Sequence, residues 1–386
     1  MTAIDLAAMR QHNSGLVLAS LFQAREPVRM ATLVRQTQLS RRTVELILST
    51  LIDEGWAAET SEPVVDTLGR PPRRYAFRTD SALFATVAFD FHAATAAIVN
   101  AYGHILHQAS TVLDDINNPP ECLQSASDLL KAVIADSGFR WPSVRGIGIS
   151  VTGRIDDDGT VMHLPDTPAW TGVRPGEHFS SVFGLPASVD NDTNLAALAE
   201  QWVGGAGGYS NFIWLIAGYR LGAGLVIRKE IHKGLHGAAG EVIQVESMGL
   251  AAMRAQPLGL ISSPVPAQRT QARSIIHAAE AGDEKALKAV EQLVDLLEPV
   301  VSTFAWTIAP EAIFLGGGLE ESRLLTAQLQ HRLQVAGLPP IQIRPSSLGE
   351  SAPLLGAAYM SRSAQNDTLV QALRENHLAA FPLPAM

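Results

Sequence analysis

The sequence predicts an α/β protein, with an N-terminal winged helix-turn-helix followed by a duplicated α/β body that contains a central cleft. Two observations lead to this prediction. Residues 1–80 show three helical patterns and then two short strand patterns. Residues 81–386 show the same order twice, an apolar strand hairpin followed by a strand and a helix. We expect one domain at 1–80, a first α/β subdomain at 81–200 and a second at 201–386, from which a C-terminal helix returns to the body.

The helix expected from Ser40 to Leu51 is the most informative segment of the chain. Apolar residues at i, i+3, i+4 and i+7 predict a buried face, made of Val44, Ile47, Leu48 and Leu51. Ser40 is a typical N-cap. The polar side near the N-terminus, where recognition helices meet base edges, carries Arg41, Arg42, Thr43 and Glu45. These features favour a DNA-reading helix over an ordinary surface helix.

The segments around this helix complete the expected DNA-binding head. A first helix spans residues 4–25, and a shorter helix precedes the turn at Gln38-Leu39. A wing strand and a turn are expected over 57–66, and a second wing strand at 73–78. Between them lies a basic arm, Gly69–Arg74, which is either a solvated linker or a DNA contact. We favour phosphate contact by Arg73 and Arg74, with Arg70 as the residue that would enter a minor groove.

The body is expected to begin with three apolar strands in an antiparallel meander, at 83–91, 94–102 and 105–112. A helix at 122–137, buried strands at 144–151 and 187–190, and a helix at 193–203 follow. The second half repeats this order with the segments 212–218, 222–231, 267–308, 312–315, 341–344 and 352–362. We expect the final residues, from Ala379, to be poorly ordered.

Composition limits the class of protein. At 47% hydrophobic and 17% charged residues the chain is globular. It shows no signal peptide and no apolar run long enough to span a bilayer, and its single cysteine, Cys122, fits a reducing cytoplasm. The formal net charge is −9. Residues 1–80 contain ten Arg and nine acidic residues, a net +1, whereas residues 81–386 contain 19 basic and 29 acidic residues, a net −10. An acidic body would limit indiscriminate DNA binding by the head.

Several segments, taken in order, resemble the ROK family, which contains sugar kinases and transcriptional regulators. The head segments SRRTVELILSTLIDEG and LGRPPRRYAF look like those of the family's regulators. The body segments that carry the resemblance are GIGISVTGRIDDDG (146–159), LPDTPAW (164–170), PASVDNDTNLAALAE (186–200), GAGLVIRKEIHKGLHGAAGEV (222–242), EAIFLGGGL (311–319) and SSLGESAPLLGAAYM (346–360). The resemblance implies an actin-like, ribonuclease-H-like fold for the body.

The resemblance also implies a sugar or effector site in the cleft. Its residues are Gly153, Arg154, Asn191, Asp192, Glu241 and Gln244. In the family's kinases the residue matching Asp192 takes a proton from the sugar hydroxyl. Without phosphate loops it can still accept a hydrogen bond from a hydroxyl, or simply cap the following helix. Gly153-Arg154 is otherwise an exposed turn, and Glu241 a surface carboxylate.

Two departures from the family's pattern argue against kinase activity. The first hairpin turn, Asp-x-Gly-Gly-Thr in family kinases, reads Asp90-Phe-His-Ala-Ala-Thr95, so Cβ atoms stand where backbone approaches phosphate. The second phosphate turn reads Ala217-Gly-Tyr-Arg-Leu-Gly222, in which Arg220 replaces a glycine. We therefore expect no catalytic residues and no nucleotide cofactor.

A third departure concerns zinc. Many relatives in the family bind it with one His and three Cys, but here Gln244 stands in the place of the His and the segment that follows contains no Cys. We expect no metal, and we expect packing alone to hold this loop.

These observations lead to one main hypothesis and two alternatives. The main one is a cytoplasmic transcriptional regulator, more a repressor than an activator, which binds an inverted-repeat DNA operator as a homodimer or tetramer. A carbohydrate or sugar derivative bound in the cleft would control it, without any membrane partner. The first alternative is a sugar kinase with a DNA-binding head. The second is a regulator controlled by a protein partner instead of a small ligand.

Overall fold

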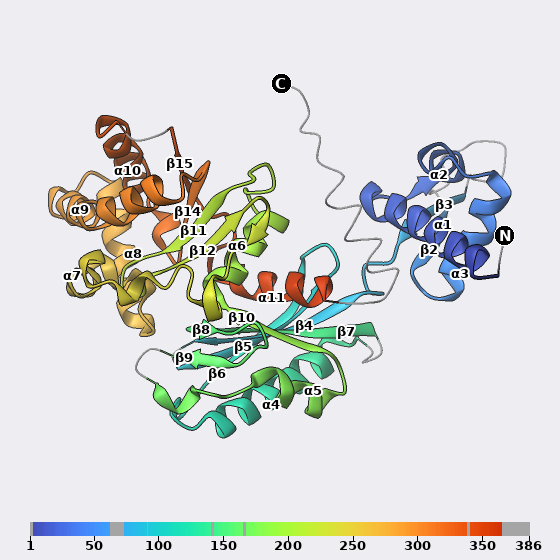
Figure 1. Ribbon diagram of the computed structural model, residues 1–386, viewed down its shortest axis with the longest axis horizontal. Helices are drawn as coiled ribbons and strands as arrows, with labels where there is room; N and C mark the ends of the chain where they lie inside the picture. The colour runs from blue at the N-terminus through green and yellow to red at the C-terminus, as the bar shows by residue number, and fades with distance from the viewer. Residues whose placement is uncertain are drawn as a thin grey trace.

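A computed structural model describes residues 3–61, 73–90, 92–139, 143–164, 167–337 and 340–364. A small N-terminal head lies beside the end of a larger body, which is built on two five-stranded sheets (Figure 1). None of the helices within the described ranges combines the length and the apolarity that a membrane span needs.

The head has the element order expected of a winged helix-turn-helix. Its helices and strands are α1 (Ala3–Ala24), β1 (Val28–Arg29), α2 (Met30–Thr37), α3 (Arg41–Asp53), β2 (Ala57–Ser61) and β3 (Arg73–Phe77). The turn between α2 and α3 depends on Gln38, whose φ is +59°. The Ser40 side chain accepts a hydrogen bond from the Thr43 N–H, and the four apolar residues of α3 are buried, so the N-cap and the buried face are confirmed.

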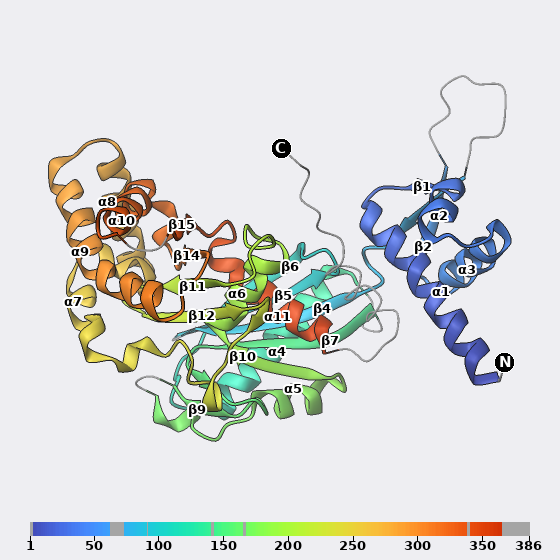
Figure 2. The ribbon, with the colours of Figure 1, turned by 45° about the horizontal axis from the view of Figure 1, so that its top comes forward.

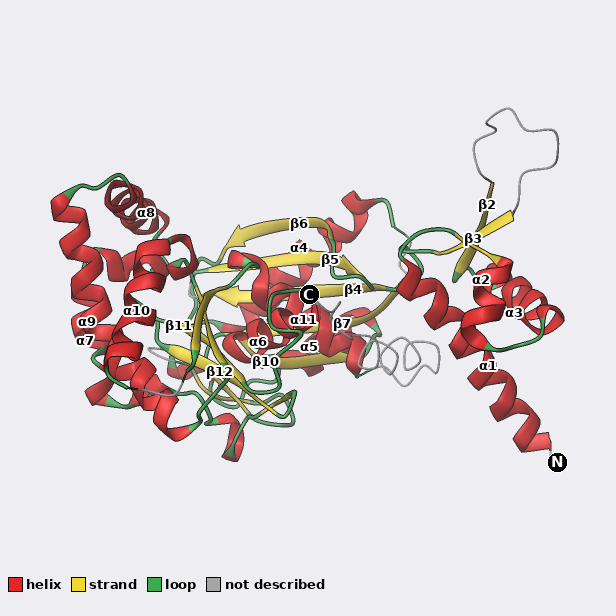
Figure 3. Cartoon of the chain, turned by 90° about the horizontal axis from the view of Figure 1, so that it is seen from above, coloured by secondary structure: helices red, strands yellow, loops and turns green. Residues whose placement is uncertain are grey.

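The first sheet of the body has the strand order β10-β7-β4-β5-β6. Its strands are β4 (Leu83–Asp90), β5 (Ala93–Asn100), β6 (Ile105–Val112), β7 (Val144–Val151) and β10 (Ala187–Asn191). The first three form the expected antiparallel meander, and β7 and β10 add in parallel. Helices α4 (Pro119–Ser137) and α5 (Pro175–Phe183) cover its outer face (Figure 1). Figure 3 shows the same strands from above.

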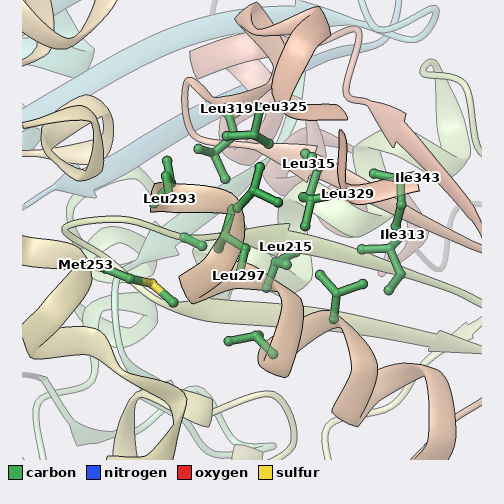
Figure 4. Packing of buried hydrophobic residues seen from close by; sticks show 14 of the residues in the cluster. Leu215, Met253, Leu293, Leu297, Ile313, Leu315, Leu319, Leu325, Leu329 and Ile343 are labelled. Carbon is green, nitrogen blue, oxygen red and sulfur yellow. The ribbon is translucent and has the colours of Figure 1, made fainter. Parts of the chain in front are cut away.

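The second sheet repeats this topology with the order β13-β12-β11-β14-β15. Its strands are β11 (Phe212–Ile216), β12 (Gly222–Ile227), β13 (Glu230–Ile231), β14 (Ala312–Gly316) and β15 (Gln342–Pro345). On its outer side lie α8 (Pro266–Glu280), α9 (Glu284–Thr307) and α10 (Arg323–Val335). Leucines of α9 and α10 pack there against strand residues such as Leu215 and Ile313 (Figure 4). The predicted duplication is confirmed.

Two helices form the central layer between the sheets (Figures 1 and 2). Helix α11 (Ala352–Ser363) packs on β4 and β7 of the first sheet, and α6 (Asp192–Trp202) packs on β11 and β12 of the second. The two helices touch at backbone level, because a Cβ added at Gly356 would lie 1.8 Å from the Leu195 carbonyl oxygen. A Cβ at Gly148 of β7 would likewise lie 2.0 Å from the Ala357 carbonyl oxygen. Two glycines therefore let α11 sit directly on its neighbours.

Some predicted elements differ from those observed. The expected strand 222–231 is split into β12 and β13, because Arg228 and Lys229 adopt positive φ values of 54° and 67° and form a turn. The long helix expected over 267–308 is two helices, since Gly282 breaks it and Asp283 caps α9. Helices α5 and α10 had no counterpart in the prediction, and the first-wing-strand residues 62–66 lie outside the described residues. The boundary predicted between residues 200 and 201 falls in the last turn of α6 and stays a prediction.

The contact between α11 and α6 gives a test of the central layer. Alanine normally stabilises a helix interior by about 1 kcal/mol relative to glycine. We expect Gly356→Ala to lower the free energy of unfolding instead, by roughly 1–3 kcal/mol, because its Cβ meets the Leu195 carbonyl oxygen. Urea unfolding of the full chain measures this. The control is Gly208→Ala, whose added Cβ meets no described atom within 4 Å and should change stability by less than about 0.5 kcal/mol. A stabilised Gly356→Ala protein would contradict the close packing.

Candidate functional site

The exposed side of α3 presents the residues predicted to read DNA. Arg41 is 78% exposed and forms an i,i+4 ion pair with Glu45 at 3.5 Å. Arg42 is also exposed, whereas Ser40 and Thr43 hydrogen-bond to each other at the N-terminus of the helix. Leu46 is 65% exposed on this otherwise polar surface. Leu46 was not among the predicted residues. The sequence does indicate its exposure, because Leu46 is apolar but lies outside the i, i+3, i+4 pattern that defines the buried face of this helix.

A groove of about 910 Å³ runs between α2, α3 and the wing strands. Four arginines from different elements line it: Arg29, Arg35, Arg41 and Arg73. Two of them meet carboxylates of the same groove, Arg41 with Glu45 and Arg73 with Glu59, the latter at 3.2 Å. Sequence reasoning missed Arg29 and Arg35, because neither belongs to an arginine cluster in the sequence.

The remaining arginines of the predicted arm differ in their placement. Arg74 is half-buried, and its Nη1 donates to the Pro27 carbonyl at 3.2 Å, so part of its hydrogen-bonding capacity is used within the head. Arg73 points to the opposite side of β3 and lines the groove. Arg70 lies outside the described residues.

The second candidate site lies in the body, at the N-terminus of α6. Asn191 is the N-cap of this helix and accepts hydrogen bonds from the Thr193 and Asn194 N–H groups at 2.8 and 3.2 Å. Its Nδ2 donates to the Gly153 carbonyl at 2.7 Å. Both ends of this amide are therefore engaged inside the protein, which suits Asn191 to positioning the loop at Gly153. The helix cap is Asn191, one residue before Asp192.

Asp192 is the first helical residue, and its carboxylate faces the cleft. Its Oδ2 accepts from Thr152 Oγ1 at 3.0 Å and from Arg220 Nη2 at 2.7 Å. The pKa of Asp192 is raised above its ordinary value, chiefly because the carboxyl is buried. Arg220 and Thr152 oppose this rise, and the nearby Asp90 adds to it. Arg220 also reaches Asp90 Oδ1 at 3.3 Å through Nη1. One arginine of the second sheet's hairpin thus joins carboxylates from two elements of the first half.

Glu241 completes the cavity. The cavity has a volume of about 40 Å³, with room for a few water molecules, and its wall includes Gly153, Asn191, Asp192 and Glu241. Burial and the neighbouring Asp192 together raise the pKa of Glu241 to about 7, and Arg154 opposes this shift. Gln244 is exposed. The structure therefore gathers four of the six predicted residues, with Arg154 beside Glu241.

Several residues of the cleft were absent from the prediction. Thr152 and Arg254 line the cavity, and the latter stacks its guanidinium 4.7 Å from the centre of the Tyr219 ring. Lys233 forms a 2.8 Å ion pair with Asp190, which is 2% exposed. Lys233 follows β13 and Asp190 lies in β10, so this pair is a second ionic contact between the halves. No local sequence pattern pairs residues so far apart along the chain.

The second phosphate-like turn, residues 217–222, is packed against a short helix, η6 (Leu258–Ser262). The Tyr219 N–H donates to the Gly259 carbonyl at 2.6 Å, and the Arg220 N–H donates to Ser262 Oγ at 3.2 Å. Met253, Leu258 and Ile261 anchor this region in the apolar core with Leu293 and Leu297, and Figure 4 shows Met253 in that cluster. Packing holds the segment that follows Gln244. Two backbone donors of the turn, those of Tyr219 and Arg220, are therefore used within the protein.

Comparison with known proteins identifies the family. The sequence pattern of the ROK family matches residues 87–249 and 245–364, which together make up most of the chain. The chain belongs to the ROK family. A putative xylose repressor of Caldicellulosiruptor sp. is 28% identical over 61% of this chain and 59% of its own length. The xylose repressor of Bacillus subtilis is 22% identical over 92% and 96%. A glucokinase of Halalkalibacterium halodurans is 26% identical over 57% and 77%.

Solved structures of ROK proteins share the fold. A ROK family transcriptional regulator, homologous to the Escherichia coli MLC protein, covers 96% of this chain and 98% of its own length, with a TM-score of 0.69 and 22% identity. A ROK glucokinase of Streptomyces griseus, in complex with glucose and AMPPNP, covers 73% of this chain and 100% of its own, with a TM-score of 0.58 and 23% identity. The regulator's coverage includes the head, whereas the kinase covers less of this chain.

The raised pKa of Glu241 predicts a pH-dependent stability. Below pH 4.5, the usual pKa of a glutamate, the Glu241 carboxyl is protonated in both the folded and the unfolded chain. Between pH 4.5 and about 7 it ionises only in the unfolded chain, so the free energy of unfolding falls as the pH rises. Glu241→Gln is neutral throughout. We expect the melting temperature of Glu241→Gln minus that of the wild type to increase from about pH 5 to about pH 7.5 and then level off. The exposed Glu246→Gln is the control, and a difference that does not change with pH would show that the pKa of Glu241 is not raised.

Proposed function

We propose that this ROK protein is a DNA-binding transcriptional regulator, a repressor whose cleft binds a carbohydrate or sugar derivative without phosphorylating it. The observation that carries the proposal is Arg220, which stands in the phosphate-like turn and bonds to Asp192 at 2.7 Å. The exposed α3 and its basic groove support the DNA-binding part. The relatives that match nearly the whole chain are named xylose repressors, which agrees with this function.

In the DNA complex that we propose, α3 enters the major groove and the arginine-lined groove follows the backbone. Arg41, Arg42, Thr43 and Glu45 are near base edges, and Leu46 offers an apolar surface to a thymine methyl group. Arg29, Arg35 and Arg73 neutralise phosphates. Glu45 and Glu59 hold two of the arginines in place until phosphate oxygens replace them.

Phosphoryl transfer finds little support in the cleft. A kinase of this family needs a free carboxylate at Asp192 and backbone donors directed at the nucleotide phosphates. Here Arg220 engages that carboxylate. Gly259 and Ser262 accept from two N–H groups of the second turn, those of Tyr219 and Arg220. The kinase alternative rests on the kinases among the relatives. We propose that catalysis is absent and that neither nucleotide nor zinc is bound.

Ligand binding in this cleft requires the two halves of the body to move apart. The cavity of about 40 Å³ is too small for a monosaccharide. Arg220 pairs with Asp192 in its wall, and Lys233 pairs with Asp190 outside that wall, so two ion pairs join the halves. Asp192 and Glu241 are suited to accept hydrogen bonds from adjacent sugar hydroxyls. Because the ligand binds one arrangement of the halves better than another, it shifts the balance between them, and DNA affinity shifts reciprocally.

One head offers too small a surface for useful operator specificity, so we propose a dimer that reads an inverted repeat. Control by a protein partner is the remaining alternative. The buried Asp192 and the half-buried Glu241 favour a small ligand, because carboxyl groups with raised pKa values inside a cleft are typical of binding sites.

The first test concerns DNA. With a duplex selected from a random pool, we expect Arg42→Ala to cost roughly 1–3 kcal/mol and to relax the base preference, because a base contact is lost. Arg35→Ala should weaken binding to all sequences alike and reduce the slope of log affinity against log salt by about 1. Gel-shift titrations at several salt concentrations measure both. Full-strength binding by an Arg41→Ala/Arg42→Ala double variant would remove α3 as the recognition helix.

The second test concerns the effector. A panel of D-xylose, D-glucose, N-acetyl-D-glucosamine and their phosphates is screened by melting temperature and by operator binding. A ligand at 100 times its Kd should stabilise the protein by about 2.7 kcal/mol. Asp192→Asn should weaken the effective sugar by about tenfold or more, because a charged acceptor is lost. Asp295→Asn is the control. It likewise removes the charge of a carboxylate that pairs with an arginine, because Asp295 of α9 lies 2.7 Å from Arg332 of α10, but it is not part of the cleft.

Two outcomes would contradict the proposal. If no carbohydrate of the panel changes melting or operator binding at millimolar concentration, the effector part fails and the protein-partner alternative replaces it. If a sugar is phosphorylated from ATP at an ordinary enzymatic rate, on the order of 1 per second, the chain is a kinase with a DNA-binding head.

A further inference from the structure

The head and the body share one apolar cluster at their junction. Phe22 of α1 stacks on Tyr102 of the β5–β6 turn, with ring centres 4.4 Å apart and an interplanar angle of 11°. Phe77 of β3 packs edge-on against both rings, at 5.3 and 5.7 Å. The Tyr102 hydroxyl donates to the Phe22 carbonyl at 2.9 Å. The ring of Tyr102 therefore helps to fix how α1 lies against the body.

An arginine from the far end of the chain lies in the same cluster. Arg362, in the last turn of α11, is 2% exposed. Its guanidinium carbon lies 5.4 Å from the ring centre of Phe22 and 5.5 Å from that of Trp202, and its Nη1 donates to the Ala101 carbonyl at 3.4 Å. Burial lowers the pKa of Arg362 to about 10, so the side chain stays charged at neutral pH. This single side chain contacts the head, the β5–β6 turn and α6.

Trp202 is the last residue of α6, and Asp192 is the first. The cleft and the junction thus lie at opposite ends of one helix of 11 residues, about 16 Å long. Helix α6 cannot slide freely past α11, because their backbones touch at Leu195 and Gly356. Ala196 and Ala197 of α6 pack on Trp214 and Ile216 of the second sheet. When that sheet moves relative to the first, α6 must move with it or lose this contact.

We propose that α6 transmits the state of the cleft to the DNA-binding head, with Trp202 and Arg362 as the positioning residues that connect the helix to Phe22. This inference rests on the proposed function and names the route of its regulation. A ligand that parts Asp192 from Arg220 changes the forces on the first turn of α6. The displacement reaches Trp202, and the guanidinium of Arg362, held between two rings, moves Phe22 and with it α1.

A second head–body contact offers a matched control. Arg145 of β7 places its guanidinium 4.8 Å from the ring centre of Trp56 in the head, and it donates to the Ser81 carbonyl at 3.3 Å. Arg145 and Arg362 share the same chemistry, an arginine on an aromatic ring and a backbone carbonyl. Arg145, however, belongs to β7 and not to α6 or α11. It fixes the segment between head and body without lying on the proposed route.

The experiment uses the full chain without any sugar, so that the cleft is perturbed by mutation alone. Arg220→Gln removes the charge that joins Asp192 and Asp90. Hydrogen exchange of the backbone amides from Val17 to Phe22 reports how firmly α1 is held. The change caused by Arg220→Gln is measured in three backgrounds: wild type, Arg362→Met and Arg145→Met.

We expect Arg220→Gln to alter exchange in α1 by about threefold or more in the wild-type and Arg145→Met backgrounds, and by clearly less in Arg362→Met. A purely structural role of Arg362 would shift the baseline of exchange but leave the effect of Arg220→Gln unchanged, which would overturn the proposal. The absence of any effect in the wild type would overturn it too. If Arg362→Met does not fold, Trp202→Phe tests the same contact. Failure of D-xylose and the other sugars to bind would contradict the effector proposal only, because this cycle uses none.

Discussion

The contact between α6 and α11 is the constraint on which the rest of the structure depends. Each helix packs on a different sheet, and their backbones meet where Gly356 faces Leu195. The two sheets are therefore joined through a helix pair, in addition to the ion pairs that Arg220 and Lys233 make between the halves. Because α6 begins in the cleft and both helices end near the head, this pair also fixes how the cleft lies relative to the head.

The order and type of most elements could be predicted from the sequence, because local patterns determine them. Hydrophobic patterns predict the buried strand at 144–151 and the buried face of the helix that contains Val44 and Leu51. The repeated order of strands and helices predicts the duplication. The errors occurred where backbone conformation decides. Positive φ values at Arg228 and Lys229, which are unusual for these residue types, cannot be read from composition, so the bend between β12 and β13 was missed.

The site could be predicted less completely. Asp192 and Glu241 were found through family resemblance, and the structure brings them to one cavity. Their partners come from distant segments: Arg220 is 28 residues from Asp192, and Lys233 reaches Asp190 from the other half of the body. Such pairs are a property of the tertiary structure. Arg220 stood out in the sequence as a lost glycine, but only its geometry shows which carboxylates it engages.

The position of Arg220 also has a consequence for which metabolites can control this protein. A sugar kinase closes around two substrates, so its conformation depends on the supply of ATP as well as sugar. Here Arg220, a side chain of the protein itself, stands in the turn that binds phosphate in the family's kinases and pairs with Asp90 and Asp192. Unlike ATP, this group is always present. In the regulator proposed above, DNA affinity would therefore depend on the concentration of the sugar alone. A fall in the ATP concentration would not change the response to that sugar.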